Sequence, residues 1–370
     1  MLRERIFGDP EGRTPDALER MVRWGPEDLR ARALRLLALQ GSGLERLRAA
    51  NIDPSPGVRR AAAWGLGLCG VAPVLTDNTE ESALAVAIAE VRACGNADPL
   101  DALDRLDRRV LHTLSGPRSP VATPQRPALR DRAWLALGAE GRILPIAELR
   151  ARTDPESLAA VGHPADVPGI VARLQTAGRR GEHSLLLALG LSGDPRALAP
   201  LHAALTAIDV DPGRGFTQRR LAAIGLGRLG FRVATRWLLR ALEAEARDYE
   251  GRPGAGLGIQ YPVRADVLWA LGELADPAAI PALIAHLSDR QGSAFGGFYL
   301  PAMDALWKIG PPAVSALERA AASTTEDTAA HAVSVLGAMG ADLGRWRADP
   351  RGAVRKIVAA VEGGRAPTSR

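Results

Sequence analysis

Apolar residues recur at every fourth position in many segments of the chain, and a small residue closes each run. One copy places Val58, Ala62 and Leu66 four residues apart and ends at Gly67. This spacing puts the apolar side chains on one stripe of an α-helix. Glycine is typical of helix C-termini, so we expect each helix to end there. The same pattern returns in residues 29–38, 129–138 and 263–272.

A second pattern follows several of these glycines and predicts the partner helix. Its two clear copies begin at Asp194-Pro195 and Asp276-Pro277, and both continue with apolar residues and a second proline. Aspartate is a good N-cap and proline suits the first helical turn, so each Asp-Pro is expected to open a helix. The repeating unit is therefore a helix A that begins at Asp-Pro, a turn, and a helix B that ends in Leu-Gly.

The spacing between successive B helices predicts the domain organisation. Steps of 24 to 29 residues correspond to a bare helix pair, and steps of 37 to 45 residues to a pair with an insertion. About ten pairs fill the chain, and neighbouring pairs share a continuous core. We expect an N-terminal capping segment in residues 1–25, one repeat array in 26–340, a C-terminal capping helix in 341–363 and a disordered tail in 364–370.

The paired motifs resemble the HEAT repeat, and most closely its short bacterial form named after phycobilisome lyases. The resemblance rests on Val-Arg-x-x-Ala-x-x-x-Leu-Gly helices alternating with Asp-Pro-x-x-Ile/Leu-Pro-x-Leu helices over residues 26–340. It implies an all-α fold, a right-handed α-solenoid whose B helices line the concave side. It is poor in functional information, because HEAT-like repeats serve as scaffolds, adaptors, lyases, hydroxylases and DNA glycosylases.

Composition and charge narrow the classes of partner. Aromatic residues make up only 4% of the chain, while Ala, Leu, Gly and Arg dominate, which argues against a β-sandwich or barrel. No apolar stretch is long enough to span a membrane, so we expect no membrane partner. The first residues lack the apolar core of a secretory signal, which favours a cytoplasmic protein. The net charge of +5 is modest for 370 residues, so nucleic-acid binding is compatible with the sequence but not indicated by it.

Three Gly-rich insertions in consecutive repeats form the first candidate binding element. Consecutive units place equivalent turns side by side, so these loops are expected to form one ridge. The alternative is that each aromatic side chain folds back onto its own repeat. The insertions span residues 206–218, 243–262 and 288–299, after an earlier Pro-rich one at 115–126. Their aromatic residues are Phe216, Tyr261, Phe298 and Tyr299.

The B helices carry the second candidate site, an Asp-x-x-Trp pattern. Trp269 lies roughly 240° round the helix from Val263 and therefore away from the core stripe. Indole faces beside carboxylates on a concave wall suit a cationic ligand or an Arg-rich peptide. Alternatively, each Trp wedges between successive B helices and each Asp pairs with a nearby Arg. The residues are Trp64, Asp131, Trp134, Asp266, Trp269, Asp304 and Trp307.

Catalytic and metal-binding patterns are weak. HEAT-like hydroxylases bind iron through paired His-Glu dipeptides, whereas here Glu182-His183 stands alone in the reverse order. His183 lies on a B helix and remains a candidate ligand-binding residue. The arginines of the repeat motif, such as Arg59 and Arg264, are expected to pair with carboxylates in the turns. We therefore predict no metal, no cofactor and no assigned catalytic residue.

Two functional hypotheses follow. The first is a non-enzymatic interaction scaffold that binds a protein segment on its concave face and loop ridge. The second is a lyase-like or glycosylase-like enzyme that uses Asp266 or Asp304 beside Trp269 or Trp307. An enzyme needs a carboxylate shielded from water with a shifted pKa inside a closed pocket, whereas a scaffold needs an open groove with several solvated contacts.

Overall fold

The structure is all-α in the part of the chain that it describes, apart from one pair of two-residue strands. It is a computed structural model, and it divides into two compact units. Unit 1 comprises residues 1–110 and 125–234, and unit 2 comprises 111–124 and 235–370. The described residues are 10, 12–95, 101, 104, 126–138, 143–152, 154–177, 179–207, 212–249, 263–289, 291–292, 298–323 and 325–363. The handedness, the number of pairs and the boundaries at residues 26 and 340 stay predictions.

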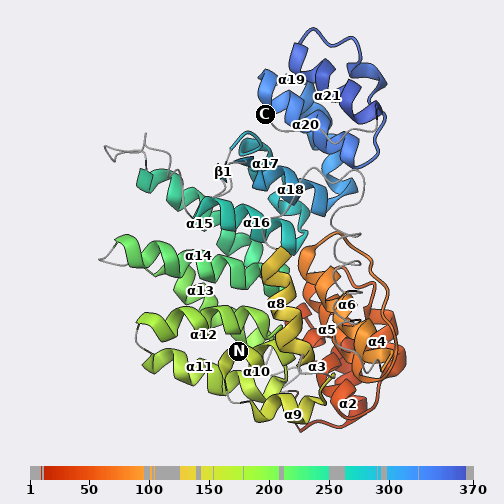
Figure 1. Ribbon diagram of the computed structural model, residues 1–370, viewed down its shortest axis with the longest axis vertical. Helices are drawn as coiled ribbons and strands as arrows, with labels where there is room; N and C mark the ends of the chain where they lie inside the picture. The colour runs from red at the N-terminus through yellow and green to blue at the C-terminus, as the bar shows by residue number, and fades with distance from the viewer. Residues whose placement is uncertain are drawn as a thin grey trace. The chain divides into compact units, whose positions relative to one another are not determined.

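Unit 1 consists of helices, which run from α2 to η3 (Figure 1). Their bounds are α2 Pro15–Trp24, α3 Glu27–Leu39, α4 Leu44–Ala50, α5 Pro56–Leu68, α6 Glu80–Ala93, α8 Arg126–Leu137, α9 Ile146–Ala151, α10 Pro155–Val161, η1 Pro164–Asp166, α11 Val167–Thr176, α12 Arg179–Leu191, η2 Pro195–Ala197, α13 Leu198–Thr206, α14 Pro212–Leu229 and η3 Arg232–Ala234.

Unit 2 follows the same alternation and contains the strand pair. In the pair, Gln291 lies opposite Tyr299 and Gly292 opposite Phe298, in antiparallel register. The bounds are α15 Thr235–Tyr249, α16 Arg264–Leu274, η4 Pro277–Ala279, α17 Ile280–Ala285, β1 Gln291–Gly292, β2 Phe298–Tyr299, α18 Pro301–Ile309, η5 Pro311–Ala313, α19 Val314–Ser323, α20 Glu326–Ala338, η6 Gly344–Trp346 and α21 Gly352–Glu362.

The Asp-Pro segments open the A helices as the sequence predicts. Asp194 accepts a hydrogen bond from the backbone N–H of Arg196 at 2.9 Å, and Asp276 accepts one from Ala278 at 3.0 Å. Each aspartate thus satisfies a backbone donor that has no partner within the first turn. The turn is a 3-10 turn in both cases, η2 and η4, and it leads directly into α13 and α17.

The glycines that close the apolar stripes have two roles. Some end a helix, as predicted, and others lie inside one. Gly138 and Gly162 follow the last helical residue with φ of +68° and +69°, a conformation that favours glycine. Gly190 and Gly272 instead lie inside α12 and α16. A Cβ at Gly190 would lie 2.5 Å from Cα of Gly225 on α14. These internal glycines let successive B helices approach closely.

The prediction of loops at residues 206–218 and 243–262 is wrong in part, because helices extend into both segments. Residues 212–218 belong to α14, which begins at Pro212, and residues 243–249 belong to α15. Proline is favoured in the first turn of a helix, and the segment after Glu243 is rich in the strong helix formers Glu, Ala and Arg. The third insertion contains the strand pair β1–β2. Most of the Pro-rich insertion, residues 115–125, lies outside the described residues.

The repeat arginines pair with turn carboxylates, as expected. Nε of Arg59 donates to Oδ2 of Asp77 at 2.7 Å, and Nη1 of Arg264 donates to Oδ2 of Asp289 at 2.9 Å. Arg30 makes the same kind of contact, with a distance of 2.8 Å to Asp53. The motif arginine therefore fastens its B helix to the neighbouring turn.

Unit 1 also contains contacts between repeats that are far apart in sequence. The backbone N–H of Gly57, at the start of α5, donates to the carbonyl of Gly230 after α14 at 2.9 Å. Nη1 of Arg60 reaches the carbonyl of Gly227, which is 167 residues away, at 3.0 Å. A regular array in which each repeat touches only its neighbours does not predict such contacts. The N-terminal B helices therefore meet the C-terminal ends of later helices within this unit (Figure 1).

No helix in the described part of the chain is both long and apolar enough to cross a lipid bilayer.

Candidate functional site

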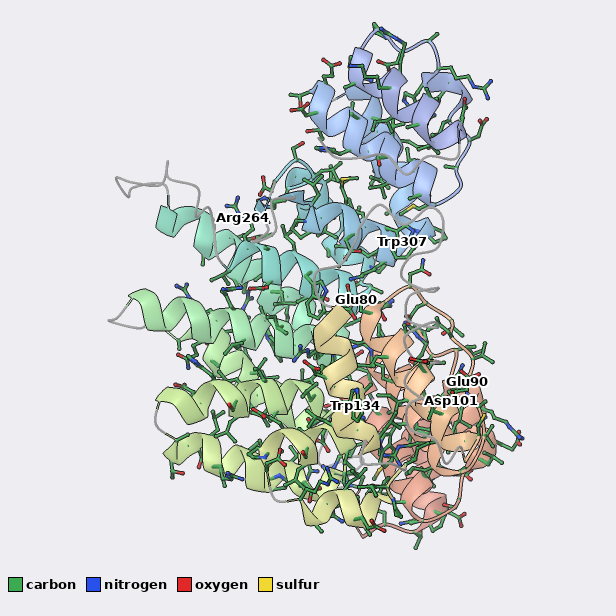
Figure 2. All side chains as sticks on the ribbon, viewed as in Figure 1. Glu80, Glu90, Asp101, Trp134, Arg264 and Trp307 are labelled. Atoms are coloured by element: carbon green, nitrogen blue, oxygen red, sulfur yellow. The ribbon has the colours of Figure 1, made fainter. Side chains whose placement is uncertain are left out.

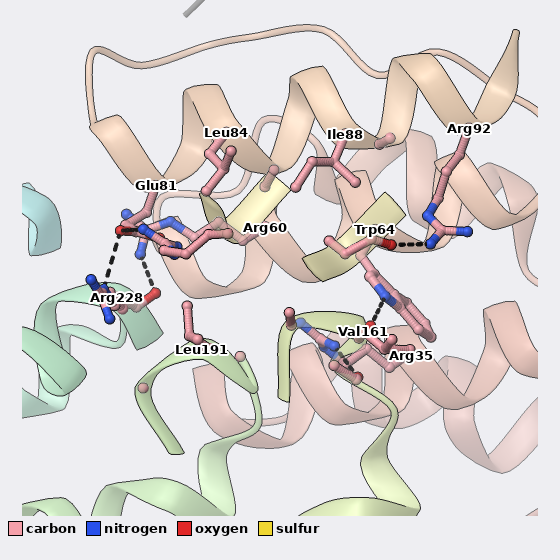
Figure 3. Close-up of a pocket in the computed structure, with 18 residues that line it drawn as sticks. Arg35, Arg60, Trp64, Glu81, Leu84, Ile88, Arg92, Val161, Leu191 and Arg228 are labelled. Atoms are coloured by element: carbon pink, nitrogen blue, oxygen red, sulfur yellow. Dashed lines mark hydrogen bonds and ion pairs between the residues drawn. The ribbon is translucent and has the colours of Figure 1, made fainter. Parts of the chain in front are cut away.

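The contacts within unit 1 shape a half-open cavity of about 100 Å³ between α3, α5 and α6 on one side and the ends of α10 and α12 on the other (Figure 3). Five arginines and one glutamate line it, so its charged lining carries an excess of four positive charges. The charged lining residues are Arg35, Arg60, Glu81, Arg92, Arg132 and Arg228.

At one end of the cavity the positive charges surround Glu81. Nη1 of Arg132 donates to its Oε1 at 2.6 Å, and Nη2 of Arg132 donates to Oε2. Nε of Arg228 lies 3.6 Å from the same Oε1. Burial by itself raises the pKa of Glu81, but the charges of these two arginines, with Arg60, lower the pKa below its ordinary value. Glu81 is therefore ionised, and the charge at this end is partly compensated within the protein.

Arg60 binds the end of α14 to the start of α6. Its Nη1 donates to the carbonyls of Gly227 and Arg228 at 3.0 and 2.7 Å. Its Nε donates to Oγ of Ser82 at 3.2 Å, and Nη2 donates to Oγ1 of Thr79 at 3.2 Å. Because lone carbonyls at a helix C-terminus accept hydrogen bonds from cations, Arg60 has a structural role beside the cavity.

At the other end, Trp64 and Arg35 pack together. The indole N–H of Trp64 donates to the carbonyl of Val161 at 2.8 Å. The guanidinium of Arg35 lies 4.9 Å from the centroid of the Trp64 ring, within cation–π range, and its Nη1 donates to the carbonyl of Gly162 at 2.5 Å. Nε of Arg35 is buried and has no hydrogen-bond partner among the described residues.

Arg92 completes this end of the cavity. Its Nη2 donates to the carbonyl of Ala136 at the end of α8 (Figure 3). Burial lowers the pKa of Arg92 to about 10, and in the described part of the chain no carboxylate is paired with it. Burial likewise lowers the pKa of Arg35 to about 10, although the charge of Asp194 opposes that shift. Burial thus disfavours the charge of both guanidinium groups, and neither has a direct ion pair among the described residues.

An apolar wall separates the two ends. Leu84 and Ile88 on α6 and Leu191 on α12 face the space between them (Figure 3). The cavity therefore offers cationic groups at either end and an apolar middle. This combination suits an anionic group carried by an apolar stem.

In unit 1 the residues that sequence patterns suggested do not form one site. Trp64 lines the cavity and is half-buried. Asp131 is exposed on α8, where Trp134 is half-buried (Figure 2). His183 is half-buried on α12 and does not line the cavity.

In unit 2 the prediction that the Asp-x-x-Trp residues line an exposed concave wall is wrong for Trp269 and Asp304. Trp269 and Asp304 are both 2% exposed, so neither lines a groove. The reason is the close approach of α16 and α18: a Cβ at Gly272 would lie 2.7 Å from Cα of Ala305. Asp266 and Trp307 are half-buried (Figure 2). The side chains of Phe216, Tyr261, Phe298 and Tyr299 lie outside the described residues.

Asp304 belongs to a buried ion cluster. Nζ of Lys308 lies 2.6 Å from its Oδ2 and 3.0 Å from Oε1 of Glu273. The ammonium also lies 5.6 Å from the centroid of the Trp269 ring. All three charged side chains are at most 4% exposed. Lys308 thus pairs with Asp304 within α18 and with Glu273 across to α16, and it compensates both buried carboxylates.

Sequence patterns missed the arginines of the cavity, although α6 carries a signal for them. Glu81, Leu84, Ile88 and Arg92 follow one another at helical spacing on a single face. A helical stripe that begins and ends with charged residues and is buried or half-buried along its length indicates a polar site inside the fold. Among the described residues, no group of three or more His, Cys, Asp or Glu side chains could hold a metal ion.

Comparison with known families finds one match. Residues 263–289, which include α16 and α17, match the PBS lyase HEAT-like repeat. No curated protein matches the chain. The resemblance to the HEAT-like repeat family is therefore confirmed at residues 263–289, and the helical repeat is the architecture of this protein.

Proposed function

We propose that the protein is a non-enzymatic interaction scaffold and that the arginine-lined cavity of unit 1 binds an acidic group of a partner protein segment. The observation that carries the proposal is the excess of four positive charges around one cavity, with Arg35 and Arg92 desolvated in it. Desolvated cations cost free energy in the empty protein, and an incoming carboxylate offsets that cost.

The contacts of Asp304 weigh against the enzyme hypothesis. A catalytic carboxylate must reach a substrate, whereas Asp304 is buried and held by the Lys308 ammonium. Its neighbour Trp269 is equally buried. The scaffold hypothesis needs only a surface that recognises a partner, and the cavity supplies one with defined charge.

Calorimetric titration of the full chain tests the proposal. A short peptide rich in aspartate, with a free C-terminal carboxylate, is compared with the same peptide in which asparagine replaces each aspartate and an amide replaces the terminal carboxylate. Arg92→Gln removes one charge from the cavity, and Arg48→Gln is the matched control because Arg48 is exposed on α4 and does not line the cavity. We expect the acidic peptide alone to bind, with affinity lost in Arg92→Gln and kept in Arg48→Gln. Equal binding of both peptides, or equal loss in both variants, would refute the proposal.

A further inference from the structure

The two cationic ends of the cavity are not equivalent. At the Glu81 end, a carboxylate of the protein already accepts both terminal nitrogens of Arg132. At the other end, the hydrogen bond that Arg92 makes within the described part of the chain goes to one backbone carbonyl, that of Ala136. An anion that enters the cavity therefore gains most at the end formed by Arg35, Trp64 and Arg92, which we call the Trp64 end.

Trp64 and Arg35 give this end a fixed shape. The indole N–H is already used by the carbonyl of Val161, so the ring offers a face and not a donor. That face lies under the guanidinium of Arg35 and holds it in place. The donors for a ligand are thus guanidinium groups, whose paired N–H groups match the two oxygens of a carboxylate.

The volume of the cavity limits what the anion can be attached to. Pockets for drug-sized ligands measure roughly 300–1,000 Å³, and an apolar cavity of about 150 Å³ admits benzene. The cavity here measures about 100 Å³. It therefore accommodates a carboxylate and a few carbon atoms, and the rest of any larger ligand would lie outside it. Leu84 and Ile88 provide the surface against which those carbon atoms pack.

We infer that the Trp64 end is a subsite for a carboxylate on a short apolar stem, supplied by the C-terminal residue of a partner segment with an apolar last side chain. A chain end brings a carboxylate and an apolar side chain into a small space, whereas an internal aspartate brings its backbone as well. The inference rests on the proposed function, since it specifies which acidic group of the partner enters. A free carboxylic acid of the same shape has the same chemistry, and the experiment separates the two sources.

The test uses the full chain and four probes in calorimetric titrations. Two are the same short acidic peptide ending in leucine, with a free C-terminal carboxylate or with a C-terminal amide. The others are 4-methylpentanoate and 4-methylpentanamide, which carry the leucine-like stem alone. We expect the amide peptide to bind about tenfold or more weakly than the acid, because it loses the charge-assisted hydrogen bonds. The free acid is expected to compete with the peptide, and 4-methylpentanamide is not.

The outcomes distinguish this inference from the proposed function. Equal binding of the acid and amide peptides overturns the inference and leaves the scaffold proposal standing. Binding of 4-methylpentanoate with no binding of either peptide keeps the carboxylate subsite but overturns both its assignment to a chain end and the scaffold proposal. If no probe binds, both fail.

Two variants place the effect in the cavity. Arg92→Gln is expected to abolish the difference between acid and amide, whereas Arg48→Gln keeps it. Because the acid and amide are compared on the native protein as well, the result does not depend on how a variant folds. A difference that persists unchanged in Arg92→Gln overturns the assignment of the carboxylate to the Trp64 end.

Discussion

Two arginines that line the cavity, Arg92 and Arg60, differ in how their charges are compensated. Burial lowers the pKa of Arg92 to about 10, so the charge of its guanidinium is disfavoured at this position. Arg60 is also buried, but its guanidinium bonds two backbone carbonyls and two hydroxyl groups. The two arginines are therefore expected to respond in opposite ways when they are replaced.

Arg92→Leu is predicted to raise the free energy of unfolding by about 1 kcal/mol, because it removes a desolvated cation and extends the apolar stripe of Leu84 and Ile88. Arg60→Leu is predicted to lower it by about 3 kcal/mol, because buried hydrogen-bond partners lose their donor. Urea unfolding of both variants checks the pair. A loss of stability in Arg92→Leu as large as that in Arg60→Leu would show that Arg92 is structural.

The ion cluster in unit 2 gives a second prediction at this scale. Lys308→Met is predicted to lower the free energy of unfolding by about 3–5 kcal/mol, because the carboxylates of Glu273 and Asp304 lose the cation that compensates them. The chain has only one other lysine, Lys356, which is exposed on α21. Lys356→Met is thus the matched control and is expected to change stability by less than about 0.5 kcal/mol.

At the scale of helices, close approach at glycine decides how the B helices stack. Gly190 faces Gly225 across α12 and α14 with no room for a Cβ, whereas Gly169 on α11 has no atom within 4 Å of the same position. The periodicity of the sequence predicted these helices and their order. It did not predict which glycines end a helix and which lie in a contact, because that depends on the neighbouring repeat.

Gly190→Ala and Gly169→Ala make a matched pair of one chemical change. The first is predicted to lower the free energy of unfolding by about 1–3 kcal/mol through overpacking. The second is predicted to raise it by about 0.5–1 kcal/mol, since alanine loses less backbone entropy than glycine on folding. Thermal unfolding measures both changes. Destabilisation of the same size at both positions would contradict the close approach of α12 and α14 at Gly190.

Turn carboxylates make the stability of unit 1 depend on pH. Burial raises the pKa of Asp77, but the charges of Arg59 and Arg60 and the hydroxyl of Thr79 outweigh burial and lower it. With the pKa lowered in the folded state, the contribution of Asp77 is complete above about pH 4 and is lost as the pH falls through the folded value. Unfolding of Asp77→Asn is therefore predicted to depend less on pH below pH 4 than unfolding of the native chain. Asp16→Asn, at an exposed position on α2, is expected to leave the profile unchanged.

At the scale of the whole molecule, the repeat pattern was predictable and the cavity was not. The i, i+4 stripes and Asp-Pro caps are local, and they identify helices from residue spacing alone. The cavity depends on contacts such as Arg35 with Gly162, 127 residues apart, which local periodicity does not specify. Local spacing also failed to predict that α16 packs closely against α18. It therefore suggested an exposed binding wall at Trp269 and Asp304, which this packing buries.

The distribution of charge also belongs to this scale. The chain carries a net charge of +5, while the lining of one cavity in unit 1 carries an excess of four positive charges. Positive charge is therefore concentrated in the lining of this cavity. Under the proposed function, we expect the protein to recognise one acidic group without a general affinity for polyanions.

Hydrogen–deuterium exchange of the full chain, with and without the acidic peptide ending in leucine, would locate the binding site. The account predicts slower exchange in α3, in the last turns of α6 and around residues 160–164, with no change in α16 or α18. Slower exchange confined to α16 and α18 would place the binding site on the helices that the sequence pattern first suggested, and would contradict the account.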